Sequence, residues 1–237
     1  MNMLILAVDT STRAGSLAVL RGDKLLAELS SVPGEPYSTR MFTDLDRLLG
    51  NLGVGLGHFD LFAVGAGPGS FTGLRVGITA VKAWGELYGR PIVAVSGLEA
   101  VAVQITDEGP ELVVPVIDAR RGQVFGAVYQ RAAGSLKLFS EEVVMGAEEF
   151  LGMVEEVGRS RGNGGTAAFG SPAPEVIRPA LERSALAGAE VHQVSGVLAP
   201  VIGRIGYERA LRGETVGVLE LDANYVRRSD AESKWKD

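Results

Sequence analysis

Polar residues that could hold a phosphate group or a metal cation follow the first apolar segment of the sequence. Asp9 ends that segment, and the hydroxyl side chains of Thr10 and Ser11 come directly after it. A carboxylate can hold a hydrated cation, and the backbone N–H groups of such a turn can approach phosphate oxygens. Asp9 could instead accept hydrogen bonds within its own turn. The sequence leaves both interpretations open.

A second candidate is the glycine-rich segment Gly-Pro-Gly-Ser-Phe-Thr-Gly at residues 67–73, between an expected strand and an expected helix. Helix N-termini favour anions because their backbone N–H groups converge there. The segment lacks the Gly-Lys-Ser/Thr ending of a P-loop, and the acidic residue that a dinucleotide fingerprint requires falls at Glu86, inside the expected helix. The candidate residues for a phosphate-type turn, or a degenerate nucleotide site, are Asp9, Thr10, Ser11, Gly67, Gly69, Ser70 and Thr72.

Catalytic and metal sites of other kinds lack the residues they need. The chain has no cysteine, which excludes zinc–thiolate sites, iron–sulfur clusters and cysteine nucleophiles. His58 and His192 are the only histidines, and neither belongs to a His-Glu-x-x-His motif. We therefore expect no metal site and no catalytic residue in this chain.

Hydrophobic patterning predicts the elements that position these residues. Apolar runs predict strands at residues 4–8, 16–20, 25–29, 60–65 and 91–95, and apolar spacing of three and four predicts helices over 38–52 and 74–88. We expect Ser70 or Thr72 to cap the second helix. Further strands are predicted at 113–117, 124–129, 136–144 and 167–170, and further helices at 148–157 and 197–211. This order indicates a mixed α/β fold.

A weak internal repeat divides the sequence. Val8 and Asp9, followed by Ala18 and Val19, recur at a constant spacing as Ile117 and Asp118, followed by Ala127 and Val128. The recurrence fits either coincidence between two hairpins or a true duplication. A duplication predicts one half at residues 1–106 plus about 196–214, a smaller half at 107–195, and a charged tail at 224–237.

The two expected N-terminal helices carry much apolar surface. In the second, the only charges are Arg75, Lys82 and Glu86, which fall on one narrow stripe. A helix that is apolar around most of its circumference must be covered on more than one side. The rest of the chain could cover it, but we favour a partner protein. The candidate interface residues are Met41, Leu45, Leu48, Leu52, Gly73, Gly77, Ala80 and Trp84.

Composition narrows the class of protein further. Of the 237 residues, 46% are hydrophobic and 22% charged, which excludes disorder as the main state. The net charge of −6 disfavours unaided binding to nucleic acid. Residues 1–8 lack the basic region of a signal peptide, and the uncharged stretch 61–74 is shorter than the roughly 18 residues that span a bilayer. We expect a cytoplasmic protein without membrane contact.

Residues 4–12, 67–75 and 117–121 together resemble the TsaB (YeaZ) family of tRNA threonylcarbamoyladenosine biosynthesis proteins. The segment Gly-Ser-Phe-Thr is specific to that family, whereas the strand ending in Asp9 is shared by the wider actin-like superfamily. The resemblance implies an α/β fold of two tandem actin-like halves (RNase H-like, ASKHA), each with a mixed sheet flanked by helices.

The family also implies a function. It suggests a non-catalytic scaffold subunit that is required for threonylcarbamoyl transfer to the adenosine next to the tRNA anticodon, docking through helices 38–52 and 72–88 on the catalytic TsaD subunit. Implied partners are a TsaE-like ATPase and, only through the complex, tRNA. We expect a homodimer when the chain is alone and no tightly bound cofactor, with weak binding of ATP or ADP with magnesium left open.

One departure from the catalytic relative supports a non-catalytic role. That relative carries a metal-binding histidine pair on the counterpart of the first helix, where this chain has Tyr37, Ser38, Thr39, Arg40 and Met41. Two alternatives remain. A stand-alone actin-like ATPase or kinase would use Asp9 and the turn at residues 67–73, and a glycoprotease-like peptidase would need a metal or nucleophile that the sequence does not offer.

Overall fold

The chain forms two compact units. The structure, a computed structural model, describes residues 2–12, 14–30, 37–106, 109–132, 135–160 and 166–227. Unit 1 comprises Met1–Ala100 and Val197–Asp237, and unit 2 comprises Val101–Gly196. The sequence placed the corresponding boundaries at residues 106/107 and about 195/196.

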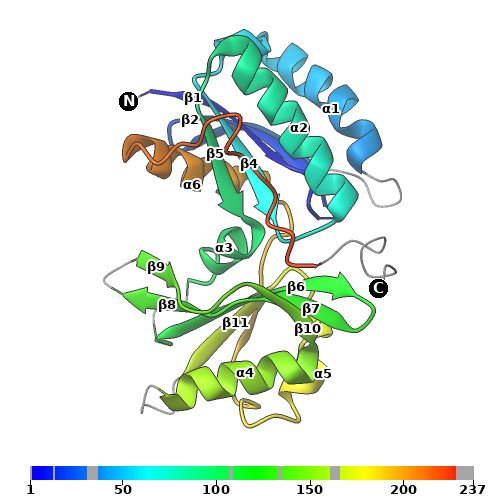
Figure 1. The fold of residues 1–237 in the computed structure, drawn as a ribbon, viewed down its shortest axis with the longest axis vertical. Coiled ribbons are helices and arrows are strands. Elements are labelled where there is room, and N and C mark those ends of the chain that lie inside the picture. The colour runs from blue at the N-terminus through cyan, green and yellow to red at the C-terminus, as the bar shows by residue number, and fades with distance from the viewer. Residues whose placement is uncertain are drawn as a thin grey trace. The chain divides into compact units, whose positions relative to one another are not determined.

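Unit 1 is built on a five-stranded mixed sheet with the order β3-β2-β1-β4-β5 (Figure 1). Its strands are β1 (Leu4–Asp9), β2 (Ser16–Arg21), β3 (Lys24–Ser30), β4 (Leu61–Gly67) and β5 (Ile92–Ser96). The first three form an antiparallel meander, and β4 and β5 continue the sheet in parallel to β1. All five strands coincide with predicted ones.

Helices cover both faces of this sheet. They are α1 (Tyr37–Leu52), α2 (Phe71–Tyr88) and α6 (Ala199–Leu211), with a short 3-10 turn at Leu56–His58. A further helix, α3 (Gly97–Ala102), follows β5 and contains the boundary between the units. Leu6 and Val8 of β1 belong to the core cluster beneath α1 and α2. On the other face, Ala7 approaches Gly203 of α6, where a Cβ would lie 3.2 Å from the alanine Cβ. Because side chains alternate along β1, this strand contributes apolar residues to the packing on both faces of the sheet.

Unit 2 repeats this plan with the strand order β10-β7-β6-β11-β12. Its strands are β6 (Leu112–Arg120), β7 (Gln123–Gly126), β8 (Tyr129–Ala132), β9 (Ser135–Leu138), β10 (Val143–Gly146), β11 (Ala167–Ser171) and β12 (Val191–Gln193). Its helices are α4 (Ala147–Ser160) and α5 (Arg178–Leu181), with a 3-10 turn at Pro174–Val176. The β8–β9 hairpin branches from β6 outside this order.

The repeat seen in the sequence is a duplication of topology. In each unit the first strand pairs antiparallel with the second, the second antiparallel with the third, and the first parallel with the fourth, which is parallel to the fifth. Asp9 ends the first strand of unit 1, and Asp118 lies near the end of its counterpart in unit 2. Coincidence between two hairpins does not produce a shared five-strand order.

Several predictions for the second half were wrong in detail. The expected strand at 124–129 is two strands, β7 and β8, and the expected strand at 136–144 is β9 and β10 with a break between them. The sequence did not predict α3, α5 and β12, which span only six, four and three residues. Helical periodicity is recognised over about 11–18 residues and strand alternation over about 4–8, so elements this short give too little pattern.

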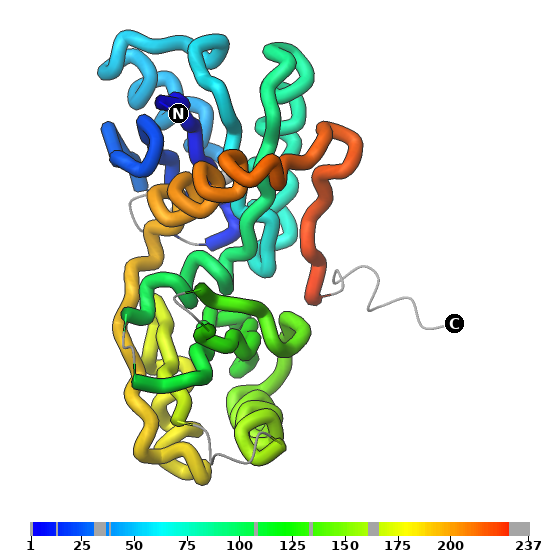
Figure 2. Tube along the Cα trace, turned by 90° about the vertical axis from the view of Figure 1, so that its left-hand side faces the viewer, coloured from blue at the N-terminus to red at the C-terminus, as the bar shows by residue number. Residues whose placement is uncertain are grey.

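Part of the predicted charged tail is packed on unit 1. The N–H of Asn224, the first residue of that tail, donates to the carbonyl of Ala66 at 2.7 Å. Val216, between α6 and the tail, forms a bridge with Ile92 at the edge of the sheet. This segment follows α6 in orange and red in Figure 2. Residues 228–237 lie outside the described part of the chain. Within the described part, none of the helices has the length and apolarity needed to cross a membrane.

Candidate functional site

Asp9 is fully buried at the end of β1, and its own turn occupies its carboxylate. Oδ1 accepts hydrogen bonds from the Ser11 N–H (2.9 Å) and the Ser11 hydroxyl (2.6 Å), and Oδ2 accepts one from the Thr12 hydroxyl (3.2 Å). Burial raises the pKa of Asp9, and the bonds from Ser11 and Thr12 oppose the rise. The geometry matches the second interpretation of the sequence, in which Asp9 organises its turn.

Thr10 ties this turn to α2. Its hydroxyl donates to the carbonyl of Gly73 at 2.6 Å and accepts from the N–H of Gly77 at 3.2 Å. Thr10 is 3% exposed, so both bonds are shielded from water. One hydroxyl therefore joins the end of β1 to two successive turns of the helix.

Gly69 and Gly73 of the motif, and Gly77 one turn further along α2, make room for this contact. A Cβ at Gly69 would lie 2.6 Å from the carbonyl oxygen of Ser11, and Cβ atoms at Gly73 and Gly77 would overlap Thr10. The N–H of Ser70 donates to the same Ser11 carbonyl at 2.8 Å. The loop at residues 10–11 thus occupies the space into which a phosphate group would have to come to meet these glycines.

The remaining residues of the predicted turn have separate roles. Ser70 is the N-cap of α2 and its hydroxyl accepts from the Gly73 N–H at 3.3 Å, which confirms the predicted cap. Gly67 has a left-handed φ of 115°, and a Cβ there would lie 2.7 Å from the Asn224 carbonyl oxygen. Thr72 is exposed on α2. The structure therefore brings Asp9, Thr10, Ser11, Gly69 and Ser70 together. Gly67 instead lies against Asn224, and Thr72 is exposed to solvent.

The predicted interface residues lie inside unit 1. Met41, Leu45 and Leu48 of α1, and Ala80 and Trp84 of α2, are at most 7% exposed and belong to its core cluster. Leu52 is partly buried against the same cluster, while Gly73 and Gly77 face Thr10. The face of α1 and α2 to which the sequence assigned a partner is thus covered within unit 1, and a partner contact at these residues stays a prediction. Apolar spacing of three and four marks the face of a helix that is covered, and here the sheet of the same unit covers it.

The outer face of α1 and α2 carries different residues. Phe42 is 56% exposed on α1, and Leu87 is 72% exposed on α2. The two helices contact one another and lie side by side over the sheet (Figure 1). Neither residue was among the candidate interface residues. Phe42 is three positions before Leu45 and Leu87 three positions after Trp84, so apolar spacing alone does not distinguish these exposed residues from the buried ones.

A stacked cluster at the start of α2 was also missed. The Arg75 guanidinium lies 3.8 Å from the centre of the Phe71 ring, and its Nε donates to the Tyr225 hydroxyl at 3.2 Å. The Phe71 and Tyr225 rings are 4.9 Å apart. The signal available in the sequence was the four-residue spacing of Phe71 and Arg75, which places them on one helix face.

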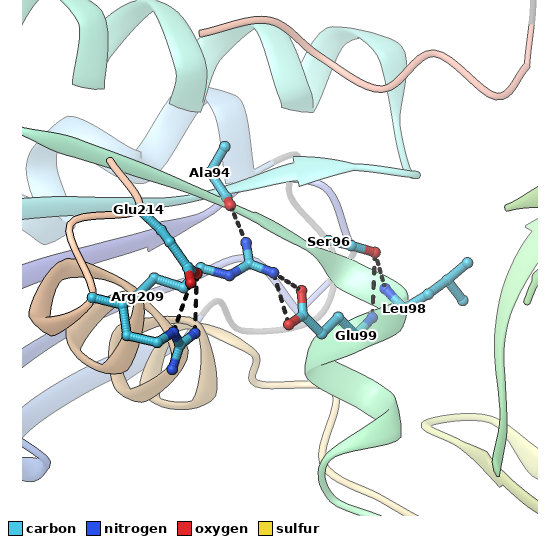
Figure 3. Close-up of polar contacts among 7 residues, drawn as sticks. Ala94, Ser96, Leu98, Glu99, Arg209 and Glu214 are labelled. Carbon is cyan, nitrogen blue, oxygen red and sulfur yellow. Dashed lines mark hydrogen bonds and ion pairs between the residues drawn. The ribbon is translucent and has the colours of Figure 1, made fainter. Parts of the chain in front are cut away.

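A bidentate ion pair holds α3 on unit 1 (Figure 3). One amino group of Arg209 on α6 donates to both carboxylate oxygens of Glu99 at 2.8 and 2.6 Å, and the other donates to the Ala94 carbonyl at 2.6 Å. Burial raises the pKa of Glu99, and the Arg209 guanidinium opposes the rise. This pair fixes α6 against β5 and the start of α3.

The two histidines stand apart from these contacts. His58 is exposed and its Nδ1 bonds to the N–H of Gly55 at 2.9 Å, while His192 Nδ1 lies 3.9 Å from a carboxylate oxygen of Glu190. Among the residues that the structure describes, no three His, Cys, Asp or Glu side chains are grouped so that they could hold a metal ion.

Two α/β units with one shared strand order, each with an Asp at or near the end of its first strand, define an actin-like fold. The fold alone is shared with EutJ from Carboxydothermus hydrogenoformans, at 13% identity and a TM-score of 0.50. YeaZ from Pseudomonas aeruginosa is more similar, with 26% identity, a TM-score of 0.71, and coverage of 94% of this chain and 99% of that one.

Sequence comparisons agree with the structural ones. The family model described as "TsaD: tRNA N6-adenosine threonylcarbamoyltransferase" matches residues 34–193. The tRNA threonylcarbamoyladenosine biosynthesis protein TsaB of Bacillus subtilis is 30% identical over 254 residues, covering 98% of both chains. TsaB of Haemophilus influenzae is 29% identical over 99% of this chain and 97% of its own. The chain belongs to the TsaB (YeaZ) family.

Proposed function

We propose that this chain is a non-catalytic subunit of the machinery that transfers a threonylcarbamoyl group to the adenosine next to the tRNA anticodon, and that it docks on a TsaD-like catalytic subunit. The observation that carries the proposal is the closed turn at Asp9. Ser11 and Thr10 fill the space beside Gly69 and Gly73, and the Asp9 carboxylate is bonded within its own loop. A site organised in this way serves packing better than phosphate chemistry.

The outer face of α1 and α2 is the docking surface in this proposal. It presents Phe42 and Leu87, two large apolar side chains that are more than half exposed. Aromatic residues such as Phe42 are enriched at the core of protein interfaces, and an exposed leucine adds apolar area beside them. The buried face of the same helices maintains the fold of unit 1, so the two faces can be tested separately.

Charge substitutions on the outer face test the docking. Phe42→Asp combined with Leu87→Asp should abolish co-purification with the TsaD-like subunit and lower the modified nucleoside in tRNA of cells that carry only this variant. The matched control is Leu211→Asp, because Leu211 is 50% exposed on α6, which packs on the opposite face of the sheet. Normal complex formation and normal nucleoside levels in the double variant, with its fold intact, would contradict the proposal.

A separate measurement tests whether the chain binds nucleotide. The closed turn supports the expectation that the chain holds no nucleotide tightly. The rival function, a stand-alone ATPase or kinase, requires saturable binding of ATP with magnesium, and this binding should disappear in Asp9→Ala. Titration calorimetry on the purified chain separates the two. Heat that saturates with nucleotide in the natural chain and is absent from Asp9→Ala would favour the rival.

Further partners are part of the same proposal. A TsaE-like ATPase joins the assembly, and the chain forms a homodimer through the outer face of α1 and α2 when the catalytic subunit is absent. The Phe42 and Leu87 double variant should then sediment as a monomer. A dimer that persists in this variant would place self-association on another surface.

A further inference from the structure

The hairpin turn between β6 and β7 has an unusual backbone. Arg120, Arg121 and Gly122 have φ angles of 67°, 55° and 73°, so three successive residues are in the left-handed region. Arg120 pairs with Gln123, and Arg121 and Gly122 form the two-residue loop, while the register shifts between Asp118 and Arg120. Both arginines are exposed.

Arginine is a poor choice for this conformation. Two-residue loops with positive φ favour Asn-Gly, because asparagine and glycine tolerate the left-handed region and other residues are strained there. Here Arg121 stands where asparagine is preferred, and Arg120 adds a second strained position. Residues that break a local rule in this way are expected at functional sites.

Asp118 holds the turn in this conformation. Its Oδ1 accepts the N–H of Arg120 at 2.8 Å, and its Oδ2 lies 3.7 Å from Nε of the same residue. The carboxylate therefore fixes the backbone and restrains one guanidinium. The Arg120 side chain remains 46% exposed beside it.

We propose that Arg120 and Arg121 bind the phosphate backbone of RNA, which under the proposed function on which this inference rests is the tRNA substrate of the complex. Guanidinium groups bind phosphate oxygens in a bidentate manner. In a chain of net charge −6, contact with a polyanion needs a local concentration of positive charge. Adjacent basic residues occur in this sequence only at Arg120 and Arg121 and at Arg227 and Arg228.

The charges around the turn set the side from which RNA approaches. A surface depression is lined by Gly122 of the turn and by Glu148, Glu149 and Arg183. Arg183 neutralises Glu148 at 2.8 Å, whereas the carboxylate of Glu149 repels a phosphate group entering the depression. RNA therefore meets the two arginines at the tip of the hairpin, away from α4.

The test replaces both arginines by the residue that the turn prefers. Arg120→Asn/Arg121→Asn removes both guanidinium groups and relieves the backbone strain. If the arginines had a structural role, this variant would be less stable, whereas an RNA-binding role predicts a more stable chain that binds RNA more weakly. We expect affinity for tRNA to fall about tenfold, and the slope of log affinity against log salt to fall by about two, or about one for each lost phosphate contact. The melting temperature should rise by about 2–4 °C.

Two further variants sharpen the measurement. Asp118→Asn keeps an acceptor for the Arg120 N–H but removes the opposing charge, so its tRNA affinity should rise. The charge-matched control is Lys137→Asn/Arg159→Asn, which removes two exposed cations of the same unit, on β9 and at the end of α4. If this control weakens binding as much as the arginine variant, the effect is one of net charge and the proposal is overturned.

Binding is measured by filter retention of labelled tRNA on the TsaD-containing complex and on the isolated chain, at low and moderate salt. Unchanged affinity and salt slope in the arginine variant, with its higher melting temperature, overturn the inference and leave the docking proposal intact. If the natural chain does not assemble with the TsaD-like subunit, the docking proposal is overturned. The RNA contact is then tested on the isolated chain at low salt, where equal tRNA retention by the natural chain and the arginine variant overturns the inference. If the arginine variant binds RNA normally but loses a partner protein, the turn is a protein contact and the inference is wrong.

Discussion

The hydroxyl of Thr10 lies against Gly77, whose N–H it accepts at 3.2 Å while donating to the Gly73 carbonyl at 2.6 Å. This pair of bonds gives Gly73 of the motif, and Gly77 one helical turn beyond it, a role in packing. The helix can approach the end of β1 closely because neither position has a Cβ.

Gly77→Ala should destabilise unit 1 by about 1–3 kcal/mol, because the added methyl group overlaps the Thr10 hydroxyl. Gly50→Ala is the matched control: Gly50 also lies within a helix, and a Cβ there meets nothing within 4 Å. Alanine should stabilise that site by about 0.5–1 kcal/mol through helix propensity. Urea denaturation of both variants checks the prediction, and equal effects would show that Thr10 yields freely.

Asp9→Asn tests the buried carboxylate through pH. Burial raises the folded-state pKa of Asp9 above 3.8, so the folded state binds its proton more tightly than the unfolded state does. That stabilisation is fully present below pH 3.8 and is lost as pH rises through the raised folded-state pKa. Relative to the natural chain, Asp9→Asn should therefore gain stability as pH rises from about 4 towards neutral. A stability difference that is constant across this range would contradict it.

The sequence predicted the sheet of unit 1 well because β1, β4 and β5 are almost continuous apolar runs and the helices carry several turns of apolar spacing. Leu6 and Val8 face one helical layer while Ala7 faces the other, so burial on both faces left a signal in every residue of β1. The repeat was visible for the same reason. Two aspartates at the ends of equivalent strands stand at equivalent points in two copies of one topology.

Periodicity could not tell which protein surface covers a helix. Leu45 and Trp84 have the spacing of an interface and of a core alike, and only the packing of the sheet beneath them decides. The sequence also could not predict that the turn after Asp9 packs against α2. It depends on Thr10 meeting Gly73 across 63 positions of chain, and spacing within a motif carries no information on such a contact.

Leu45→Ala separates the two faces of α1. Leu45 is 5% exposed within the core, so truncation should lower the free energy of unfolding by about 2–5 kcal/mol. Phe42→Ala, on the exposed side of the same helix, should change it by about 0.5 kcal/mol or less. Chemical denaturation of the isolated chain measures both. A small loss for Leu45→Ala would return this residue to the candidate interface.

The ion pair of Arg209 and Glu99 should be strongly coupled. Arg209→Ala leaves a largely buried carboxylate without its partner, and because the two side chains are 26% and 22% exposed we expect a loss of about 2–3 kcal/mol. The double variant that also lacks the Glu99 side chain should be only slightly less stable than Arg209→Ala alone. A double-mutant cycle in thermal unfolding measures the coupling. Additive losses would mean that the bond from Arg209 to the Ala94 carbonyl dominates.

Tyr225 holds the last described segment of the chain on the first turns of α2. Its ring lies 4.9 Å from that of Phe71, and its hydroxyl accepts from Arg75 at 3.2 Å. Tyr225→Phe removes only the hydrogen bond, whereas Tyr225→Ala also removes the ring contact and should cost about 0.5–1.5 kcal/mol more. Because this segment is anchored at Asn224 through Ala66, the alanine variant should lose hydrogen-exchange protection first at the N–H of Asn224. Unchanged protection there would show that the contacts of Asn224 hold the segment without the aromatic cluster.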